Sequence, residues 1–130
     1  MLAENPTLCV FFETIGQVIQ DAEFKRSTLR FLLILFVEVE PGNFLTGWSA
    51  HGLSRKYAMD YASALDALKL LIRKDWLRQL DNGTGVQRYR LSPYLCWRGR
   101  PWKARIAQKN WDAEAALARL STSWDNEPQT

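Results

Sequence analysis

The chain has 130 residues, of which 47% are hydrophobic, and this length suffices for one domain with a single core that needs no disulfide or metal. The longest apolar run, residues 31–37, is too short to span a bilayer, and the first residues lack the pattern of an export signal, so we expect no membrane. The two cysteines, Cys9 and Cys96, stand among apolar and aromatic neighbours, which indicates a reducing, cytoplasmic setting.

The net charge of +3 is distributed unevenly along the chain. Residues 1–53 hold three Lys/Arg and six Asp/Glu, residues 54–105 hold twelve and four, and residues 106–130 hold two and four. The positive excess, +8, is therefore confined to the middle segment. Such segregation is typical of a nucleic-acid-binding face, although a basic surface without a partner would have the same pattern.

Residues 1–26 are predicted to form an N-terminal arm or a short helix, because TLCVFF is a β-rich run and ETIGQVIQDA has a helical pattern. A core helix follows, capped by Ser27 or Thr28 and stopped by the turn-forming residues 41–43. Its apolar residues recur at spacings of three and four, and those expected to face the core are Leu29, Leu32, Leu33, Phe36 and Val37.

A helix-turn-helix is predicted next. Residues 44–46 can form a short strand, and residues 48–57 form a short helix with Ser49 as its N-cap. After a turn at residues 58–60, Asp60 caps a second helix that runs to about residue 74. The residues expected on its inner face are Ala64, Leu65, Leu68, Leu71 and Ile72. The candidate recognition surface on its outer face consists of Tyr61, Ser63, Asp66, Lys69 and Arg73.

Two strands, residues 76–80 and 86–91, are joined by Asp81-Asn82-Gly83-Thr84-Gly85, which is a strong hairpin signal. Alternation in the second strand favours Tyr89 and Leu91 on the core face and leaves Arg88 and Arg90 outward. The element order predicts a mainly α fold with a small β-hairpin, an α+β winged helix-turn-helix with an additional C-terminal helix.

The predicted organisation has four parts. Residues 1–26 are the arm, and residues 27–100 are the winged helix-turn-helix domain. Residues 101–120 form a C-terminal helix, which begins at a proline suited to a first turn and packs on the core or on a dimer partner. Residues 121–130 are expected to be a flexible polar tail.

The phrase YRLSPYLCWRG at residues 89–99 and the upstream LDALKLLIRKDWL resemble the RepL family of plasmid and phage replication proteins. The likeness covers about residues 27–100, and it departs at Ser92, where the family pattern has asparagine, and in the compact N-terminal region. It implies DNA binding through the helix that starts near Tyr61 and through the wing at residues 82–85. A plasmid- or phage-encoded transcriptional regulator built on the same module would have the same pattern.

Double-stranded DNA is therefore the expected partner. In this motif one helix enters the major groove, while the preceding helix and the wing meet phosphates or the neighbouring groove. Ser63 is short enough to meet a base edge or a phosphate, and the long basic side chains reach the backbone. The predicted DNA-binding residues are Arg55, Lys56, Tyr61, Ser63, Lys69, Arg73, Lys74, Arg88 and Arg90. Any single one of these cations could instead be an ordinary solvated charge.

Other functions have less support. His51 is the only histidine, the acidic residues are scattered, and the glycines at 83 and 85 lack the lysine of a phosphate-binding loop, so we expect no enzyme, cofactor or metal site. Trp97, Trp102 and Trp111 lie close to basic residues and could stack single-stranded bases, or they could pack the last helix on the core or on a second copy.

We expect a homodimer, and a two-fold symmetric dimer predicts a palindromic site. Three roles stay open for the DNA-binding or interaction surface. They are a sequence-specific transcriptional regulator of a plasmid or phage, a RepL-type replication initiator, and a winged-helix protein-interaction module without DNA binding.

Overall fold

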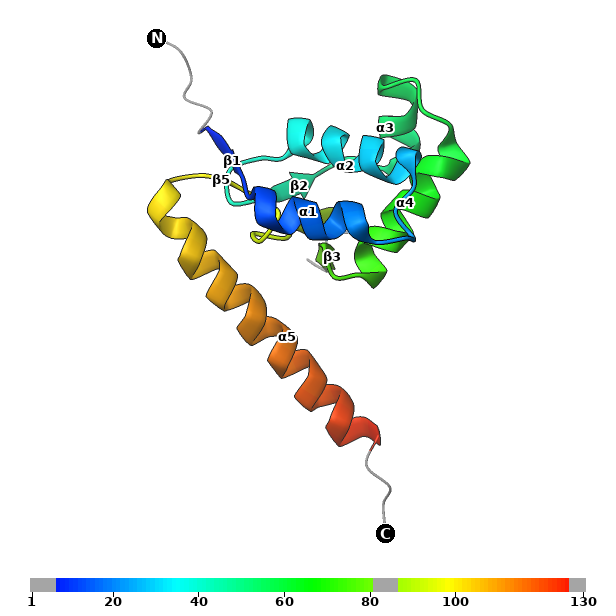
Figure 1. Cartoon of the computed structure of the whole chain (residues 1–130). Helices are drawn as coiled ribbons and strands as arrows, with labels where there is room; N and C mark the ends of the chain where they lie inside the picture. The colour runs from blue at the N-terminus through cyan, green and yellow to red at the C-terminus, as the bar shows by residue number, and fades with distance from the viewer. Residues whose placement is uncertain (1–6, 81–86, 127–130) are drawn as a thin grey trace.

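The structure is a computed structural model that describes residues 7–80 and 87–126, and side chains as far as residue 120. Figure 1 shows a body of short helices and strands from which one long helix projects. The elements in chain order are β1 (Leu8–Val10), α1 (Phe12–Gln20), α2 (Arg26–Glu38), β2 (Phe44–Thr46), α3 (Ala50–Lys56), α4 (Tyr61–Arg73), β3 (Leu77–Leu80), β4 (Arg88–Leu91), β5 (Cys96–Arg98), the 3-10 turn η1 (Pro101–Lys103) and α5 (Ala104–Asn126).

The order of elements from α2 to β4 is that of a winged helix-turn-helix, as predicted. Helices α3 and α4 form the helix-turn-helix and pack on each other, and α4 also packs on α2. Strands β2, β4 and β3 form an antiparallel sheet in that spatial order, so the short strand before α3 pairs with the second strand of the hairpin. The predicted turn at residues 82–85 lies outside the described residues.

The core lies between α2, α4 and one face of the three-stranded sheet. Phe31, Leu35, Leu71 and Leu91 are among its fully buried side chains. Tyr89 is buried as well, which confirms the predicted inward face of β4. Because β2 and β3 both pair with β4 opposite Tyr89, this residue is central to the sheet. Its ring stacks on that of Trp48, with 4.7 Å between the ring centroids.

Three residues predicted to face the core are instead exposed. Leu33 and Val37 on α2 are 53% and 67% exposed, and Ile72 on α4 is 37% exposed. Helix α2 is apolar on almost every side, so its spacing of three and four fits more than one face. The face that packs contains Phe31 and Leu35, which the spacing argument did not select.

The helix caps follow local sequence. The Ser49 hydroxyl accepts a hydrogen bond from Gly52 N–H at 3.0 Å, and the Asp60 carboxylate accepts one from Ser63 N–H at 3.0 Å, as predicted. Helix α2 begins earlier than expected, with Lys25 at its N-cap position. Ser27 and Thr28, the predicted caps, therefore lie inside its first turn, where the Thr28 hydroxyl accepts a hydrogen bond from Lys25 N–H at 3.3 Å.

The N-terminal segment is tied to the chain that follows the wing. Strand β1 pairs antiparallel with β5, and Phe11 N–H donates to the Leu95 carbonyl at 3.0 Å. The sequence did not predict β5, because a strand of three residues in a Pro- and Gly-bounded loop has almost no periodicity to detect. The predicted arm, residues 1–26, and the predicted domain, residues 27–100, thus each contribute one strand to the same two-stranded sheet.

Helix α5 starts on the body and then extends away from it (Figure 1). Ala104 and Ala107 pack beside Trp97, and Trp111 is 4% exposed, so the first two turns are anchored. The helix runs to Asn126, which corrects the predicted end at residue 120 and the tail beginning at 121. No proline or glycine stands between Ala104 and Pro128 to interrupt it.

Asn43 joins three segments that are far apart in sequence. It is fully buried, and its amide nitrogen donates to the Leu91 carbonyl at 3.1 Å and to the Cys96 carbonyl at 2.8 Å. Its amide oxygen accepts a hydrogen bond from Arg98 N–H at 2.9 Å. Its backbone has a φ of +68°, in the left-handed region that asparagine tolerates better than most residues. One side chain thus holds the turn before β2 against β4 and β5.

We expect Asn43→Ala to lower the free energy of unfolding by about 2–4 kcal/mol, because it leaves two carbonyls and one N–H buried without partners. Urea unfolding followed by circular dichroism measures this. Asn43→Gly removes the amide but accepts the positive φ, and it should also be destabilising. The matched control is Gln17→Ala, which removes an exposed amide side chain from α1, with an expected change of less than about 0.5 kcal/mol. Wild-type stability in the glycine variant would show that the amide bonds are unimportant.

Candidate nucleic-acid interface

The outward face of α4 is the candidate recognition surface. With 100° between successive helical residues, Ala62, Asp66, Lys69 and Arg73 point away from the buried face, and all four are exposed. Tyr61 is 45% exposed at the first position of the helix. Its ring meets that of His51 on α3 edge to face, at 5.3 Å between centroids. The start of α4 thus presents an aromatic pair beside the exposed face of the helix.

Two of the predicted cations are exposed and unpaired. Among the residues that the structure describes, Arg55 and Lys69 have no hydrogen-bond or ion-pair partner. Lys56, next to Arg55, forms an ion pair with Glu38 at 3.0 Å, and the hydrogen bond to that carboxylate raises the pKa of Lys56. Lys69 and Arg55 can therefore contact a phosphate without breaking an ion pair.

The C-terminal end of α4 is neutralised by acids from the α1–α2 connection. Glu23 pairs with Arg73, and Lys74 pairs with Glu23 at 2.8 Å and with Asp21 at 3.1 Å. Hydrogen bonds from Arg73 and then from Lys74 lower the pKa of the Glu23 carboxyl to about 2. Both carboxylates remain charged at neutral pH, so Arg73 and Lys74 add little net positive charge to this end of the surface.

Ser63 lies at the start of α4 and is half-buried. Its N–H and its hydroxyl both donate to the Asp60 carboxylate, at 3.0 Å and 3.2 Å. The hydroxyl oxygen can still accept a hydrogen bond. Ser63 therefore serves the helix cap, and its remaining capacity suits a donor on a base edge better than a phosphate.

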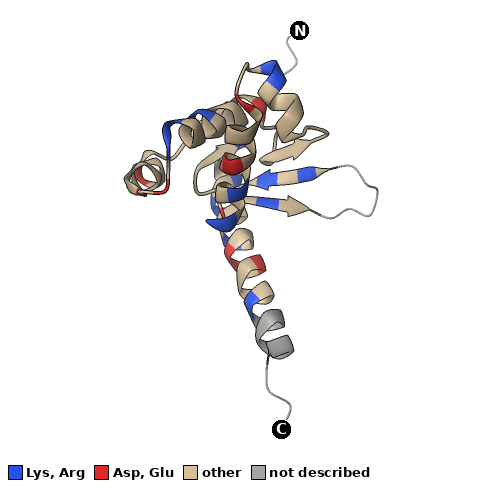
Figure 2. Ribbon diagram, turned by 90° about the vertical axis from the view of Figure 1, so that its right-hand side faces the viewer, with Lys and Arg blue, Asp and Glu red and all other residues tan. Residues whose placement is uncertain are grey.

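Arg88 and Arg90 project from the outer face of the hairpin, as predicted. Both guanidinium groups lie over the Phe44 ring, at 4.2 Å and 5.0 Å from its centroid. Arg90 also donates to the Gly42 carbonyl at 3.3 Å and lies 3.9 Å from a Glu114 carboxylate oxygen. Figure 2 shows the hairpin projecting from the body with basic residues along both strands. Arg88 is the freer of the two, since Arg90 is held by three groups of this chain.

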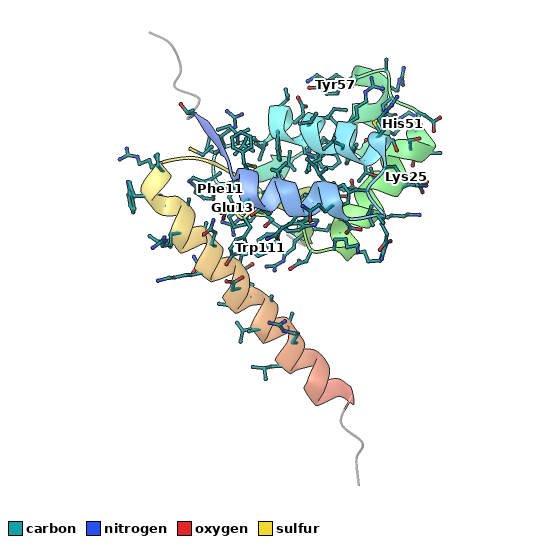
Figure 3. All side chains as sticks on the ribbon, viewed as in Figure 1. Phe11, Glu13, Lys25, His51, Tyr57 and Trp111 are labelled. Atoms are coloured by element: carbon teal, nitrogen blue, oxygen red, sulfur yellow. The ribbon has the colours of Figure 1, made fainter. Side chains whose placement is uncertain are left out.

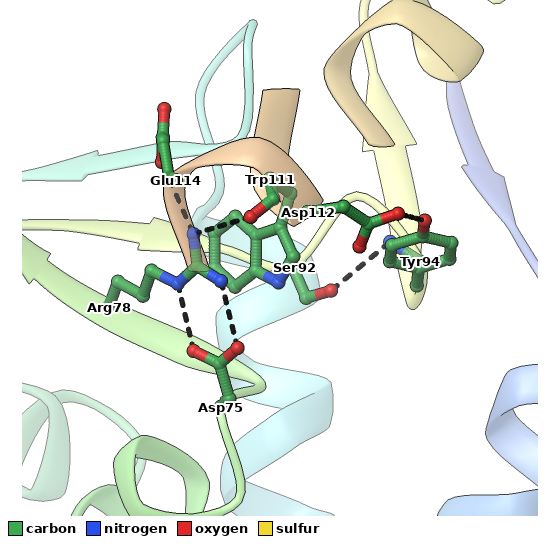
Figure 4. A network of polar contacts seen from close by, with 7 residues as sticks. All are labelled: Asp75, Arg78, Ser92, Tyr94, Trp111, Asp112 and Glu114. Atoms are coloured by element: carbon green, nitrogen blue, oxygen red, sulfur yellow. Dashed lines mark hydrogen bonds and ion pairs between the residues drawn. The ribbon is translucent and has the colours of Figure 1, made fainter. Parts of the chain in front are cut away.

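Arg78, which pairs opposite Arg90 in the sheet, holds α5 against the base of the hairpin. Figure 4 shows its guanidinium bound on two sides by carboxylates, with Asp75 at 2.8 Å and Glu114 at 3.2 Å. It also lies 3.5 Å from the ring centroid of Trp111 and donates to the Trp111 carbonyl at 3.1 Å. Because α5 covers this part of the sheet, the outer face near Arg78 and Arg90 is not open to a DNA backbone.

The tryptophans near the C-terminus do not form one stacking surface. Trp97 and Trp111 are buried, and Trp97 Nε1 donates to the Arg100 carbonyl at 3.0 Å. Only Trp102 of this group is exposed, at 63%. Packing of the last helix on the core therefore accounts for two of the three rings, and a single-strand platform built from all three does not exist in this fold.

Sequence reasoning missed three cations that the fold brings to the start of α4. Lys25, Arg26 and Arg30 line a hollow of about 400 Å³ together with Asp60 and Ser63. Figure 3 shows Lys25 and His51 at the α3–α4 end of the molecule. The segment that contains these cations has a net charge of −3, which hid them in the linear charge count.

The described residues contain no cluster of three or more His, Cys, Asp or Glu side chains that could hold a metal ion. The two cysteines stand at neighbouring, not opposing, register positions of the β1–β5 pair, and burial raises the pKa of the Cys96 thiol to about 12. No helix in the described part of the chain combines the length and apolar composition that crossing a membrane requires.

No protein-family model matches the sequence, and no curated protein matches it either. Among solved structures, one described as a possible transcriptional regulator from Methanosarcina mazei Go1 is 15% identical, covers 88% of this chain and 89% of its own, and has a TM-score of 0.40. The adhesin competence repressor AdcR from Streptococcus pyogenes is also 15% identical, with 89% of this chain and 78% of its own covered and a TM-score of 0.39. The winged-helix assignment rests on the element order and strand pairing of this chain itself.

Proposed function

We propose that this protein binds double-stranded DNA as a sequence-specific transcriptional regulator, without catalysis or cofactor. The observation that carries the proposal is the outward face of α4, which no other described element covers and which displays the unpaired Lys69. Helix α4 would enter the major groove, with Ser63 and Tyr61 near base edges. Lys69 and Arg55 would meet the phosphates that flank the groove.

The resemblance of residues 89–99 to RepL proteins supports a finer proposal, a regulator carried by a plasmid or phage. A replication initiator of RepL type is the second candidate, and the same residues favour it. At the position where that family has asparagine, the Ser92 hydroxyl accepts a hydrogen bond from Tyr94 N–H at 3.2 Å, a bond that an asparagine side chain also makes. Selection of bound sites from a random duplex library, followed by their location at promoters or at origins, separates the two roles.

Lys69→Ala is expected to weaken binding to every duplex sequence and to reduce the slope of log K against log salt by about one, since one phosphate contact is lost. Fluorescence anisotropy titrations at four salt concentrations measure both quantities. The control is Lys109→Ala, which removes one exposed lysine from α5, away from α4, and should leave the slope unchanged.

Salt-independent binding of the wild-type chain, or none at low salt, would reject the DNA proposal and favour a protein-interaction module. Equal effects of the two lysine substitutions would mean that net charge and not the α4 face drives binding.

We propose a homodimer formed through α5. Ile106, Leu117 and Leu120 are 51%, 66% and 58% exposed, and with Ala113 they follow one side of the helix opposite Trp111. The 106, 113 and 120 positions recur every seven residues, which is the spacing at which two helices pair along a common seam. A second copy supplies a matching stripe, and the resulting two-fold axis would place two α4 helices on two half-sites.

Leu117→Glu should shift the protein from dimer to monomer in sedimentation velocity, because it places a charge within the seam. Arg119→Glu introduces the same side chain two residues later, on the other side of α5, and should leave the dimer intact. A monomeric wild-type chain at high micromolar concentration, or an unaffected Leu117 variant, would remove this part of the proposal.

A further inference from the structure

All three cations of the first 53 residues lie together in the fold. Lys25, Arg26 and Arg30 are exposed residues around the first turn of α2. They line one side of the hollow, and Asp60 and Ser63 line its α4 side. Lys25 and Ser63 also line an adjoining hollow that reaches Arg73 along α4. The acidic segment of residues 1–53 thus has all three of its Lys and Arg side chains beside the start of the candidate recognition helix.

These three cations form no ion pair within the described part of the chain, although Glu23 and Asp66 line the adjoining hollow. Among the described residues, no carboxylate lies within 4 Å of a Lys25, Arg26 or Arg30 nitrogen. Asp60 faces the same hollow, but its carboxylate already accepts the two hydrogen bonds of the α4 cap. Arg30 donates to the Tyr57 carbonyl at 2.9 Å, which holds its guanidinium at the α3–α4 turn and leaves other N–H groups available.

Helix stability does not account for these residues. The helix dipole places partial positive charge at an N-terminus, so acidic side chains are favourable in a first turn and basic ones are not. Helix α2 has no acid in its first turn, and cations occupy its N-cap position and the first helical position. A cluster that is unfavourable for its own helix, and that has no ion-pair partner among the described residues, is suited to bind an external anion.

We propose that Lys25, Arg26 and Arg30 bind phosphates of the DNA strand that borders the groove occupied by α4. The inference rests on the proposed DNA-binding function and adds a second backbone contact, supplied by α2, on the side of α4 where Ser63 lies. Arg30 is oriented by its bond to Tyr57, while Lys25 and Arg26 supply long, mobile cations. The Ser27 hydroxyl, in the same hollow, is a further donor. With Lys69 on the outer face of α4, the cluster would fix the angle at which α4 lies in the groove.

The test compares two double variants with the same change in net charge. Lys25→Ala with Arg26→Ala should lower the salt slope by about two and weaken binding to all duplexes alike, because two phosphate contacts are lost. Lys109→Ala with Arg119→Ala removes two exposed cations from α5 and should keep the wild-type slope. Both are titrated as full chains against the same duplex, and thermal unfolding is recorded in parallel.

Loss of two cations from a helix N-terminus should leave the melting temperature unchanged or raise it, so weaker binding by the first variant would not reflect unfolding. A wild-type slope in that variant, or an equal loss in both variants, would overturn the inference while the proposed function stands. Absence of duplex binding by the wild-type chain would overturn both.

Discussion

The arrangement of the wing depends on the hydrogen bonds that the Asn43 side chain forms. It is buried in a turn with a left-handed backbone and satisfies two carbonyls and one N–H of segments about 50 residues away. Because these groups belong to the end of β4 and to β5, Asn43 fixes the hairpin against the turn that follows α2. It also fixes the strand that leads into α5. The wing, the N-terminal strand and the C-terminal helix therefore share one anchoring point, which a hydrophobic core alone would not specify.

This arrangement decides which basic residues face outward. The sequence has an acidic segment, residues 1–53, then a basic one, residues 54–105, and then a second acidic one, residues 106–130. In the fold, acids of the first and third segments form ion pairs with cations of the second. Asp21 and Glu23 neutralise the C-terminal end of α4, and Glu114 on α5 meets both Arg78 and Arg90 on the sheet. Much of the +8 charge of residues 54–105 is thus neutralised by ion pairs within the protein. Among the described residues, exposed cations without an ion pair remain around the α3–α4 turn and the first turn of α2, and others lie at residues 100–109 and 119, at the start of α5 and along it.

The parts of the fold that the sequence predicted are those that local chemistry determines. Ser49 and Asp60 cap helices through their own neighbours, and alternation in β4 correctly separates Tyr89 from Arg90. What failed depends on tertiary contacts. The buried face of α2 cannot be read from a helix that is apolar on most sides, and β5 exists because β1 and Asn43 bind it.

The candidate site was predictable only in part for the same reason. The outer face of α4 follows from helical periodicity, but ion pairing of Arg73 and Lys74 with residues about 50 positions earlier leaves no local signal. Lys25, Arg26 and Arg30 were missed because a segment count averages their charge with six acids. Only the packing of α2 on α4 brings these three cations next to the candidate recognition surface.

The most direct test is an NMR titration of the ¹⁵N-labelled full chain with a duplex selected for binding. The largest amide shift changes should fall on residues 25–30, on the α3–α4 turn and on residues 61–69. Small changes are expected at Arg78 and Arg90, whose outer face is covered by α5. Dominant changes at those two arginines and along α5, with residues 25–30 and 61–69 unaffected, would contradict DNA binding through α4 and the first turn of α2.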